Sequence, residues 1–261
     1  MIKNLTSEFP RPGLTICIPA YNEERGVADT VASVLSAAEQ LKGNHEIIIV
    51  NDGSSDGTGA VADELAERFE WVIAIHQETN KGVGAALKLV LERASFDRIT
   101  LIPGDYAYSQ QGIEGLMRNA HRADLLISFR DNETRPPVRR VLSWVFSSWL
   151  RIITGCPLRD GHSLFVFPVE PVRALVQILP DDHRYHVVAL VHLLCSTRSF
   201  VQVPVYLQPK ADSSSGVMRL SFITKISLTM MKLFLESKVL GVPFRRHRPV
   251  EISRSEELPV R

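Results

Sequence analysis

The stretch that decides the fold reads Ile47-Ile48-Ile49-Val50-Asn51-Asp52-Gly53-Ser54-Ser55-Asp56-Gly57-Thr58. A continuous apolar run ends in acids, glycines and hydroxyls, and a helical pattern follows it. This is how a buried parallel strand delivers polar groups to the ligand crevice at its carboxyl end. A matching stretch lies upstream and reads Leu14-Thr15-Ile16-Cys17-Ile18-Pro19-Ala20-Tyr21-Asn22-Glu23-Glu24. Two such strand ends with a helix between them predict a nucleotide pocket.

Bulk composition fits one large α/β domain in a chain of 261 residues. The formal net charge is +1, so no global field favours nucleic acid as a partner. Cys17, Cys156 and Cys195 lie scattered in apolar surroundings and read as reduced thiols without metal spacing, which is typical of a cytoplasmic protein. We find no signal-peptide pattern and no run of roughly 18 apolar residues that would span a membrane.

Strands and helices alternate in the first half, which predicts a parallel, doubly wound sheet. The predicted strands there are 14–18, 46–50, 71–76 and 98–102, with helices at 24–41, at 58–69 and from the residues after 82 to 94. The second half is predicted to hold strands at 124–129, 163–167 and 200–207 and helices at 139–153, 185–196 and 220–240. Pro204 has no N–H to donate, so its strand is expected at an edge of the sheet.

Five pieces of sequence, taken in order, resemble the family 2 glycosyltransferases of the GT-A fold, and within them the polyprenyl- (dolichyl-) phosphate mannose or glucose synthases. The pieces are Ile18-Pro19-Ala20-Tyr21-Asn22-Glu23, Asn51 to Thr58, Asn80-Lys81-Gly82, Asp105 at the end of the fourth strand, and Arg159-Asp160-Gly161-His162-Ser163. The resemblance runs from about residue 14 to 220. It implies a single GT-A domain over 1–241, with a nucleotide-binding half at about 12–125 and an acceptor half at about 126–241. Residues 242–261 are expected to form a basic, flexible tail.

The resemblance also implies which residues hold the nucleotide. The acids that match Glu23 and Asp52 contact the base and ribose in the family, and Pro19 and Tyr21 suit the wall against which a base lies. Alternatively, Asp52 and Asp56 cap the next helix and turn.

The third piece is expected to lie close to the nucleotide. We expect Gly82 and Gly84 to allow close backbone approach to it, with Lys81 as a nearby cation. The alternative interpretation of these residues is a simple helix start.

Asp105 is the predicted ligand of a divalent cation. In the family, Asp-x-Asp stands here and helps to hold the metal–diphosphate, and hard oxygen donors suit Mg²⁺ or Mn²⁺. This chain has Pro103-Gly104-Asp105, so only the second acid is present. The departure leaves open a site in which water or another side chain completes the metal shell, or one without metal.

In the second half, Asp160 matches an acid that lies near the reacting phosphates in the synthases, and His162 is a candidate hydrogen-bond donor to a phosphate. Asp182, with Asp181, is a candidate catalytic base, although acids are favoured at any helix start. The helix that follows lacks the glutamate of the prenyl-phosphate subgroup. A phosphate acceptor is already an anion at neutral pH and needs no base.

Positive charge for the phosphates is expected from Arg130 and Lys210, together with Arg135, Arg139 and Arg219. Lys210 and the serine-rich loop 213–216 stand where the family has a loop that closes over the donor. A solvated linker is the alternative.

Two apolar helices, 139–153 and 220–240, carry basic residues and fit helices lying on an anionic bilayer, with 245–248 adding attraction. They fit equally well against the protein core or a second subunit. We therefore expect a cytoplasmic protein with peripheral membrane contact or a homo-oligomer.

The sequence thus predicts an inverting glycosyltransferase. It would move a sugar from a UDP- or GDP-linked donor to a polyprenyl phosphate or a small-molecule hydroxyl. A non-catalytic sugar-nucleotide-binding homologue is the main alternative, because the Asp-x-Asp is incomplete. A nucleotidyltransferase would need a glycine-rich basic loop after the first strand, which residues 20–23 do not provide.

Overall fold

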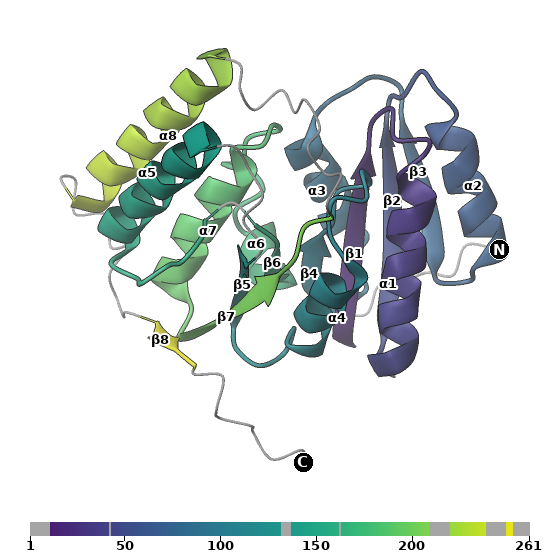
Figure 1. Cartoon of the computed structure of the whole chain (residues 1–261), viewed down its shortest axis with the longest axis horizontal. Helices are drawn as coiled ribbons and strands as arrows, with labels where there is room; N and C mark the ends of the chain where they lie inside the picture. Colours follow the sequence, from purple (N-terminus) through teal and green to yellow (C-terminus); the bar gives the residue numbers. More distant parts are fainter. Residues whose placement is uncertain are drawn as a thin grey trace.

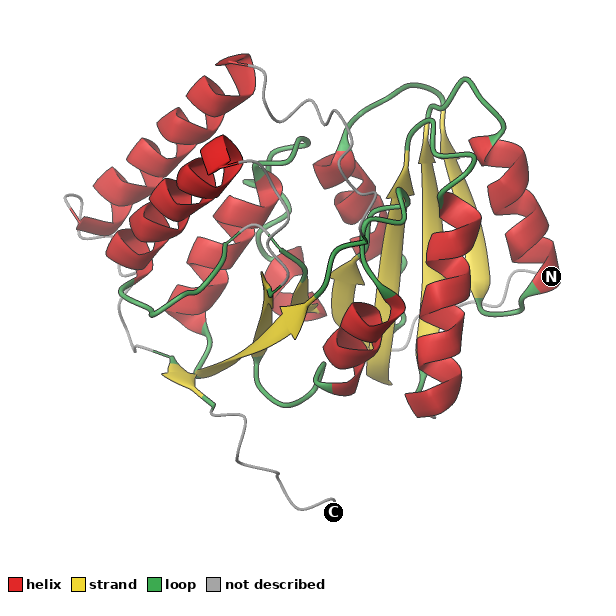
Figure 2. Ribbon diagram, viewed as in Figure 1, coloured by secondary structure: helices red, strands yellow, loops and turns green. Residues whose placement is uncertain are grey.

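The computed structural model describes residues 11–41, 43–131, 137–161, 163–208, 220–238 and 249–252. One mixed sheet runs through them (Figures 1 and 2). Its strands are β1 (Arg11–Ala20), β2 (His45–Asp52), β3 (Val72–Gln77), β4 (Phe96–Leu101), β5 (Leu125–Arg130), β6 (Phe165–Pro168), β7 (Ser199–Val205) and β8 (Val250–Glu251). The helices are α1 (Val27–Leu41), α2 (Thr58–Arg68), α3 (Val83–Leu91), α4 (Gln110–Arg118), α5 (Pro137–Thr154), α6 (Val169–Arg173), α7 (Tyr185–Ser196) and α8 (Leu220–Lys238).

The strand order is β3-β2-β1-β4-β6-β5-β7-β8. All neighbours pair in parallel except β6, which is antiparallel to both β4 and β5. The prediction of a doubly wound, mostly parallel sheet with flanking helices is therefore confirmed. The chain moves from β1 outward to β2 and β3 and then returns to the other side of β1 as β4. This reversal is the topological switch point at which such sheets bind ligands.

Helices cover both faces of the sheet because the strands are apolar on both faces. Ile16, Ile18 and Ile49 point into a core with α1, α2 and α4. Alternate residues of the same strands, such as Cys17 and Ile48, join the opposite core with α3, α6, α7, α5 and α8. Figure 1 shows α5 and α8 side by side at the end of the molecule opposite α2.

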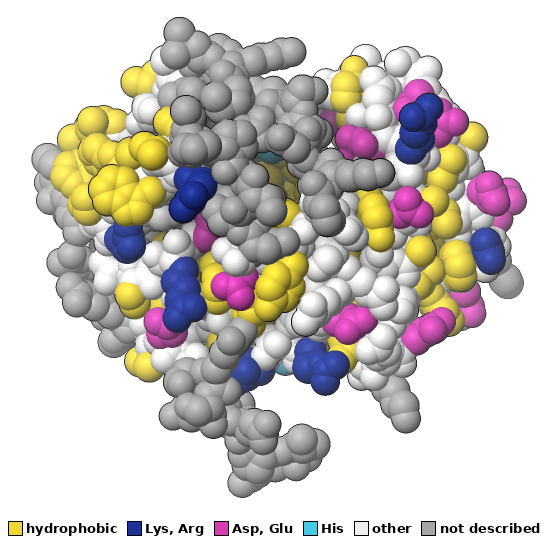
Figure 3. All heavy atoms as spheres, in the orientation of Figure 1, with side chains coloured by type: hydrophobic (Ala, Val, Ile, Leu, Met, Phe, Trp, Pro, Cys, Tyr) yellow, Lys and Arg dark blue, Asp and Glu magenta, His cyan; other side chains and the backbone are white. Residues whose placement is uncertain are grey.

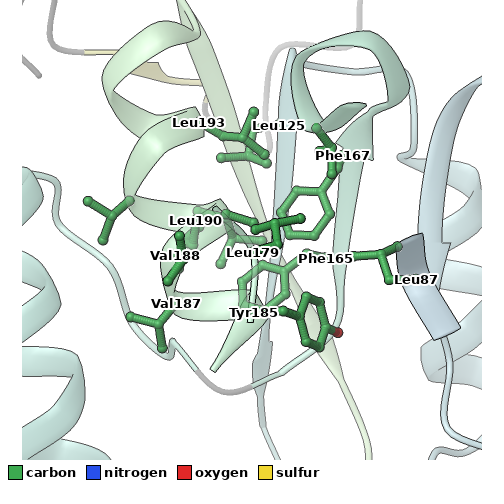
Figure 4. Close-up of a cluster of buried hydrophobic side chains, with 14 of the residues drawn as sticks. Leu87, Leu125, Phe165, Phe167, Leu179, Tyr185, Val187, Val188, Leu190 and Leu193 are labelled. Atoms are coloured by element: carbon green, nitrogen blue, oxygen red, sulfur yellow. The ribbon is translucent and has the colours of Figure 1, made fainter. Parts of the chain in front are cut away.

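The second core is built around β6 and α7. Phe165 and Phe167 stack with ring centroids 5.5 Å apart on one face of β6. Figure 4 shows both rings beside Leu190 and Leu193 of α7, with Leu87 of α3 reaching the same cluster. This core fixes the acceptor half against the sheet.

Three features differ from the sequence-based expectations. The first helix begins at Val27 rather than near residue 24, because residues 22–24 are hydrogen-bonded to the loop after β2. Helices α4 and α6 were not predicted. The expected loose tail does not hold for residues 249–252: Val250 N–H donates to Arg198 O at 2.8 Å, and β8 adds to the start of β7.

The strand with Pro204 is only in part an edge. β8 covers Ser199 and Phe200, whereas Pro204 pairs with Phe129 of β5 and has no strand on its other side among the described residues. The missing N–H of Pro204 therefore costs no ladder hydrogen bond there.

Candidate functional site

The loops after β1 and β2 are joined to each other by side-chain hydrogen bonds. Asn22 is the centre: its N–H donates to Ser54 Oγ at 3.0 Å and its Oδ1 accepts from Ser55 N at 2.9 Å. Asn22 takes a left-handed backbone conformation with φ 56°. Glu23 N–H donates to Thr58 Oγ1 at 2.8 Å. These bonds fix the backbone that carries the Glu23 carboxylate at the end of β1.

Asp56 supports the same loop pair. Its Oδ1 accepts from Thr58 N at 3.0 Å and its Oδ2 from Glu24 N at 3.3 Å. The hydrogen bond from the Thr58 hydroxyl outweighs other influences and lowers the pKa of Asp56. The geometry therefore favours the capping interpretation of Asp56 over direct ligand contact.

The loop after β4 is held against β1 and α1. Gly104 N–H donates to Pro19 O at 3.1 Å, and Tyr106 N–H donates to Thr30 Oγ1 at 3.1 Å. A Cβ on Gly26 would lie 2.6 Å from Gly104 O, so only glycine permits this close approach. Tyr106 has φ 54°, a strained conformation for a bulky residue. Tyr106 directly follows Asp105, so this strained backbone belongs to the loop that places Asp105 at the switch point.

Glu23 and Asp105 are two carboxylates without a compensating cation among the described contacts. Burial of Glu23, followed by the negative charges of Asp105 and Asp56, raises the pKa of Glu23. Desolvation likewise raises the pKa of Asp105, although its side chain remains open to solvent. A carboxylate surrounded by protein yet reachable from outside is suited to a cationic or hydrogen-bond-donating ligand.

Asp52 at the end of β2 has its carboxylate occupied by the protein. Its side chain accepts hydrogen bonds from Lys81 N at 2.7 Å, Gly82 N at 2.8 Å and Gln77 Nε2 at 2.9 Å, and the residue is 4% exposed. It therefore fixes the loop that leads into α3, not the start of α2 that the alternative interpretation named. Contact of Asp52 with a base stays a prediction.

Gly82 and Gly84 lie close to the protein backbone of residues 180–182, and their approach to a nucleotide stays a prediction. Gly82 has φ 95°, and a Cβ on Gly84 would collide with Pro180 O. The Asp181 carbonyl accepts from Gly84 N at 2.7 Å and from Ala85 N at 3.1 Å. The Gly84 and Ala85 amides in the first turn of α3 are thus paired with the acceptor half.

The remaining predicted nucleotide contacts surround these groups. Tyr21 is 48% exposed just beyond β1, Pro19 is half-buried within that strand, and the Lys81 side chain is exposed. An exposed ring and a free-standing lysine side chain at strand ends are compatible with the predicted base wall and cation. His162 and Lys210 lie outside the described residues.

Arg130 and Asp160, predicted for separate roles, form one ion pair. Arg130 Nε and Nη2 donate to the two Asp160 carboxylate oxygens at 2.8 and 3.2 Å. Both side chains are about nine-tenths buried. Because the guanidinium and carboxylate neutralise each other, Arg130 is a support for Asp160 in this arrangement rather than an open phosphate-binding cation.

A hydroxyl cluster beside this pair escaped the sequence analysis. Ser128 Oγ donates to Ser163 Oγ at 2.7 Å, and Ser163 is hydrogen-bonded to the buried Tyr108. Burial raises the pKa of Tyr108. The sequence could have pointed to Ser163, which belongs to the Arg159–Ser163 piece. No local pattern indicates that Tyr108 lies against Ser163.

The candidate base Asp182 is held by its neighbour. Partial burial alone would raise the pKa of Asp182, but hydrogen bonds from Arg184 outweigh it and lower the pKa. Arg184 N and Nε donate to Asp182 Oδ1 at 2.9 and 2.8 Å. A carboxylate with a lowered pKa is a weak general base, so the geometry favours a role in the turn before α7.

Residues 15–165 match the family described as Glycosyl transferase family 2. The chain belongs to this family. Among curated family 2 relatives, glycosyltransferase AglD of Haloferax volcanii is 26% identical over 216 residues, which is 79% of this chain and 35% of the relative. Dodecaprenyl-phosphate galacturonate synthase of Rhizobium johnstonii is 28% identical over 177 residues, 66% of this chain and 52% of the relative. The chain thus spans about a third to a half of these relatives.

Among solved structures, glucosyl-3-phosphoglycerate synthase from Mycobacterium tuberculosis in complex with Mn²⁺, UDP and glucosyl-3-phosphoglycerate superposes with a TM-score of 0.60 at 19% identity. The match covers 87% of this chain and 80% of that one. It shows that this family 2 chain has the GT-A fold.

The residues at the switch point suit a hard divalent cation in part. Across the described ranges no group of three or more His, Cys, Asp or Glu side chains is placed to hold a metal ion. Mg²⁺ in nucleotide sites is commonly held by one or two carboxylates together with substrate phosphates. Asp105, whose negative charge helps to raise the pKa of Glu23 on the loop after β1, fits that type of site.

Proposed function

We propose that this family 2 protein transfers a sugar, with inversion, from a nucleoside diphosphate sugar to a polyprenyl phosphate. One observation carries the proposal. Glu23 and Asp105 lie at the topological switch point on loops that hydrogen bonds hold in place, and the pKa values of both carboxylates are raised. The names of the polyprenyl-phosphate relatives support the choice of acceptor.

For donor binding, we assign the nucleoside to the ends of β1 and β2. Tyr21 and Pro19 would contact the base, with Asp52 fixing the adjacent loop through Lys81 and Gly82. Glu23 would accept from the ribose. Asp105 would hold Mg²⁺ or Mn²⁺, which when bound neutralises the charge that develops on the leaving diphosphate.

For acceptor binding, the second half provides a set of polar side chains that hydrogen bonds already hold in place. The Arg130–Asp160 pair and the Ser163 hydroxyl lie behind Tyr108, on the side of β4 away from β2. No strong base is required there, because a phosphate oxygen of the acceptor attacks as an anion. The low pKa of Asp182 agrees with an acceptor of this kind. A hydroxyl acceptor would need a base, and Asp182 with its lowered pKa is a weak one.

Because polyprenyl phosphates reside in bilayers, we place the reaction at a membrane surface, on its cytoplasmic side. Where the chain is described, no helix is long and apolar enough to cross a membrane.

The test begins with thermal shift against UDP, GDP and their sugars, each with and without Mn²⁺. The responding donor is then offered to a short-chain prenyl phosphate and to the prenol of equal length, and the product's anomeric configuration is read by NMR. We expect transfer to the phosphate alone, with inversion. Transfer to the prenol would favour a hydroxyl acceptor. Donor binding without transfer to any acceptor would favour a non-catalytic homologue.

Asp105→Asn is the decisive variant. We expect transfer to fall by at least about a hundredfold, as when a group that stabilises developing charge is removed. The melting temperature should not fall, since a desolvated carboxylate is replaced by a neutral amide. Asp63→Asn is the matched control, because Asp63 is an exposed acid on α2 whose partner among the described residues is His76. Activity retained in Asp105→Asn would remove Asp105 from the mechanism.

A further inference from the structure

Helix α5 has a buried apolar side and further apolar side chains that are exposed. Phe146, Leu150 and Ile153 face the core and are buried. Elsewhere on the helix Trp144, which is 66% exposed, and Ile152 are exposed, together with Val141, Leu142 and Val145. Large apolar side chains exposed together on one helix are typical of an interaction surface. These exposed side chains of α5 have no cover among the described residues.

Helix α8 continues this surface. Its inner side places Ile226, Met230 and Leu233 in the core, while Leu228 is 71% exposed. The rings of Trp149 and Phe234 meet edge-on at 5.8 Å and join the two helices. We call the exposed set the α5–α8 apolar surface; its members are Val141, Leu142, Trp144, Val145, Ile152, Leu228, Met231 and Leu235. Figure 3 shows hydrophobic side chains gathered over this end of the molecule, with basic side chains beside them.

The charges bordering this surface are mostly basic; the acid among them is Glu236 of α8, whose Oε1 lies 3.8 Å from Lys232 Nζ. On α5, Arg140 and Arg151 are exposed and lie four residues before and seven after Trp144, which places all three along one line of the helix. The sequence of α5 contains no acid. On α8, Lys225 and Lys232 are exposed and lie seven residues apart.

We propose that the α5–α8 apolar surface docks on an anionic lipid bilayer, with both helices lying in the plane of the interface. Trp and aliphatic side chains on one face, bordered by Arg and Lys, are the pattern of helices that bury about 5–10 Å into the headgroup boundary. The proposal rests on the lipid-phosphate acceptor proposed above, which lies in such a bilayer. A second copy of this chain is the weaker occupant, because a twofold contact would bring the basic borders of both copies together at a desolvated surface.

The experiment is flotation of the full chain with phosphatidylcholine vesicles, with and without phosphatidylglycerol, at low and high salt. We expect flotation with the anionic vesicles and its loss in high salt. Trp144→Ser/Leu228→Ser should weaken binding about tenfold. Arg140→Gln/Arg151→Gln should weaken it about fivefold per charge, and only at low salt. Trp71→Ser is the control, because Trp71 is a similarly exposed tryptophan at the opposite side of the sheet.

Several outcomes would overturn the proposal. Flotation of Trp144→Ser/Leu228→Ser equal to that of the unaltered chain would do so. A concentration-dependent dimer that the same variant dissociates, without flotation, would assign the surface to a second copy. All variants are first checked for an unchanged melting temperature, and the charge variant tests the proposal even if the apolar variant fails to fold.

The proposed function is tested separately, by measuring sugar transfer to a short-chain prenyl phosphate in the absence of vesicles. Normal transfer without flotation would reject the docking surface alone. Flotation without transfer would reject the acceptor and leave the docking surface standing.

Discussion

Two acidic sites in this protein are built in opposite ways. At the ends of β1 and β4, Glu23 and Asp105 are oriented by backbone hydrogen bonds of their own loops, and their carboxylates have raised pKa values. Beyond β4, Asp160 is buried against the Arg130 guanidinium, which contacts both of its carboxylate oxygens. The first site has charge to be neutralised by a ligand. The second is already neutralised.

This difference separates binding groups from supporting groups. A desolvated carboxylate costs free energy in the folded protein unless a ligand relieves it, which is typical of a site whose function opposes stability. A buried ion pair with good geometry holds its surroundings in place but is costly to break. We therefore expect substitutions at the first site to change activity and those at the second to change folding.

The largest expected effect on stability comes from breaking the second site. Arg130→Met should lower the free energy of unfolding by about 3–5 kcal/mol, because it leaves the Asp160 carboxylate buried without its guanidinium. Urea denaturation followed by circular dichroism measures this. The double variant Arg130→Met/Asp160→Leu should recover most of the loss. If the single variant were as stable as the unaltered chain, the ion pair would not support the fold and the comparison would fail.

An intermediate effect on stability is expected at Asp52. This residue lies in the donor half, but its carboxylate is occupied by hydrogen bonds from the protein, as that of Asp160 is. Asp52→Asn should cost about 2 kcal/mol, because an amide NH₂ would face the N–H groups of Lys81 or Gly82. Asp63→Asn, at an exposed acid, should cost almost nothing. Nucleotide affinity is measured by calorimetry on the same samples. A large loss of affinity at unchanged stability would instead make Asp52 a direct ligand of the base.

The smallest effect is the pH dependence of stability. The folded-state pKa values of Glu23 and Asp105 are raised, so the folded protein binds these protons more tightly than the unfolded chain. Their unfavourable contribution is complete at neutral pH and is relieved as the pH falls through the raised values. Glu23→Gln/Asp105→Asn should therefore melt higher than the unaltered chain at pH 7, with a difference that shrinks towards acid.

Asp182→Asn provides the opposite sign as a control. The folded-state pKa of Asp182 is lowered, so its contribution to stability is present at neutral pH and is lost as the pH falls through that lowered value. This variant should melt lower at pH 7 and converge with the unaltered chain in acid. Parallel pH profiles for the two variants would contradict the assignment of opposite environments.

The strands and their polar ends were predictable because each depends on a local pattern. Apolar runs at 14–18 and 46–50 became buried strands, and their polar ends lie at one edge of the sheet. Helix α4 was missed although Ser109 caps it by accepting from Gly112 N at 3.2 Å, since its apolar positions Ile113, Leu116 and Met117 are few. Nothing local indicated β8, a two-residue strand that forms only because the start of β7 offers an unpaired edge.

The sequence by itself determined the alternation of strands and helices, the GT-A resemblance and the acids at the strand ends. These follow from hydrophobic periodicity and from short motifs, which act over a few neighbouring residues. Only the tertiary structure decided which polar groups are paired. Arg130 meets Asp160 across 30 residues, and the Asp181 carbonyl caps α3 across nearly a hundred. Such pairings depend on the order and packing of the strands. They distinguish an acid that can bind a ligand, such as Asp105, from one that stabilises the fold, such as Asp160.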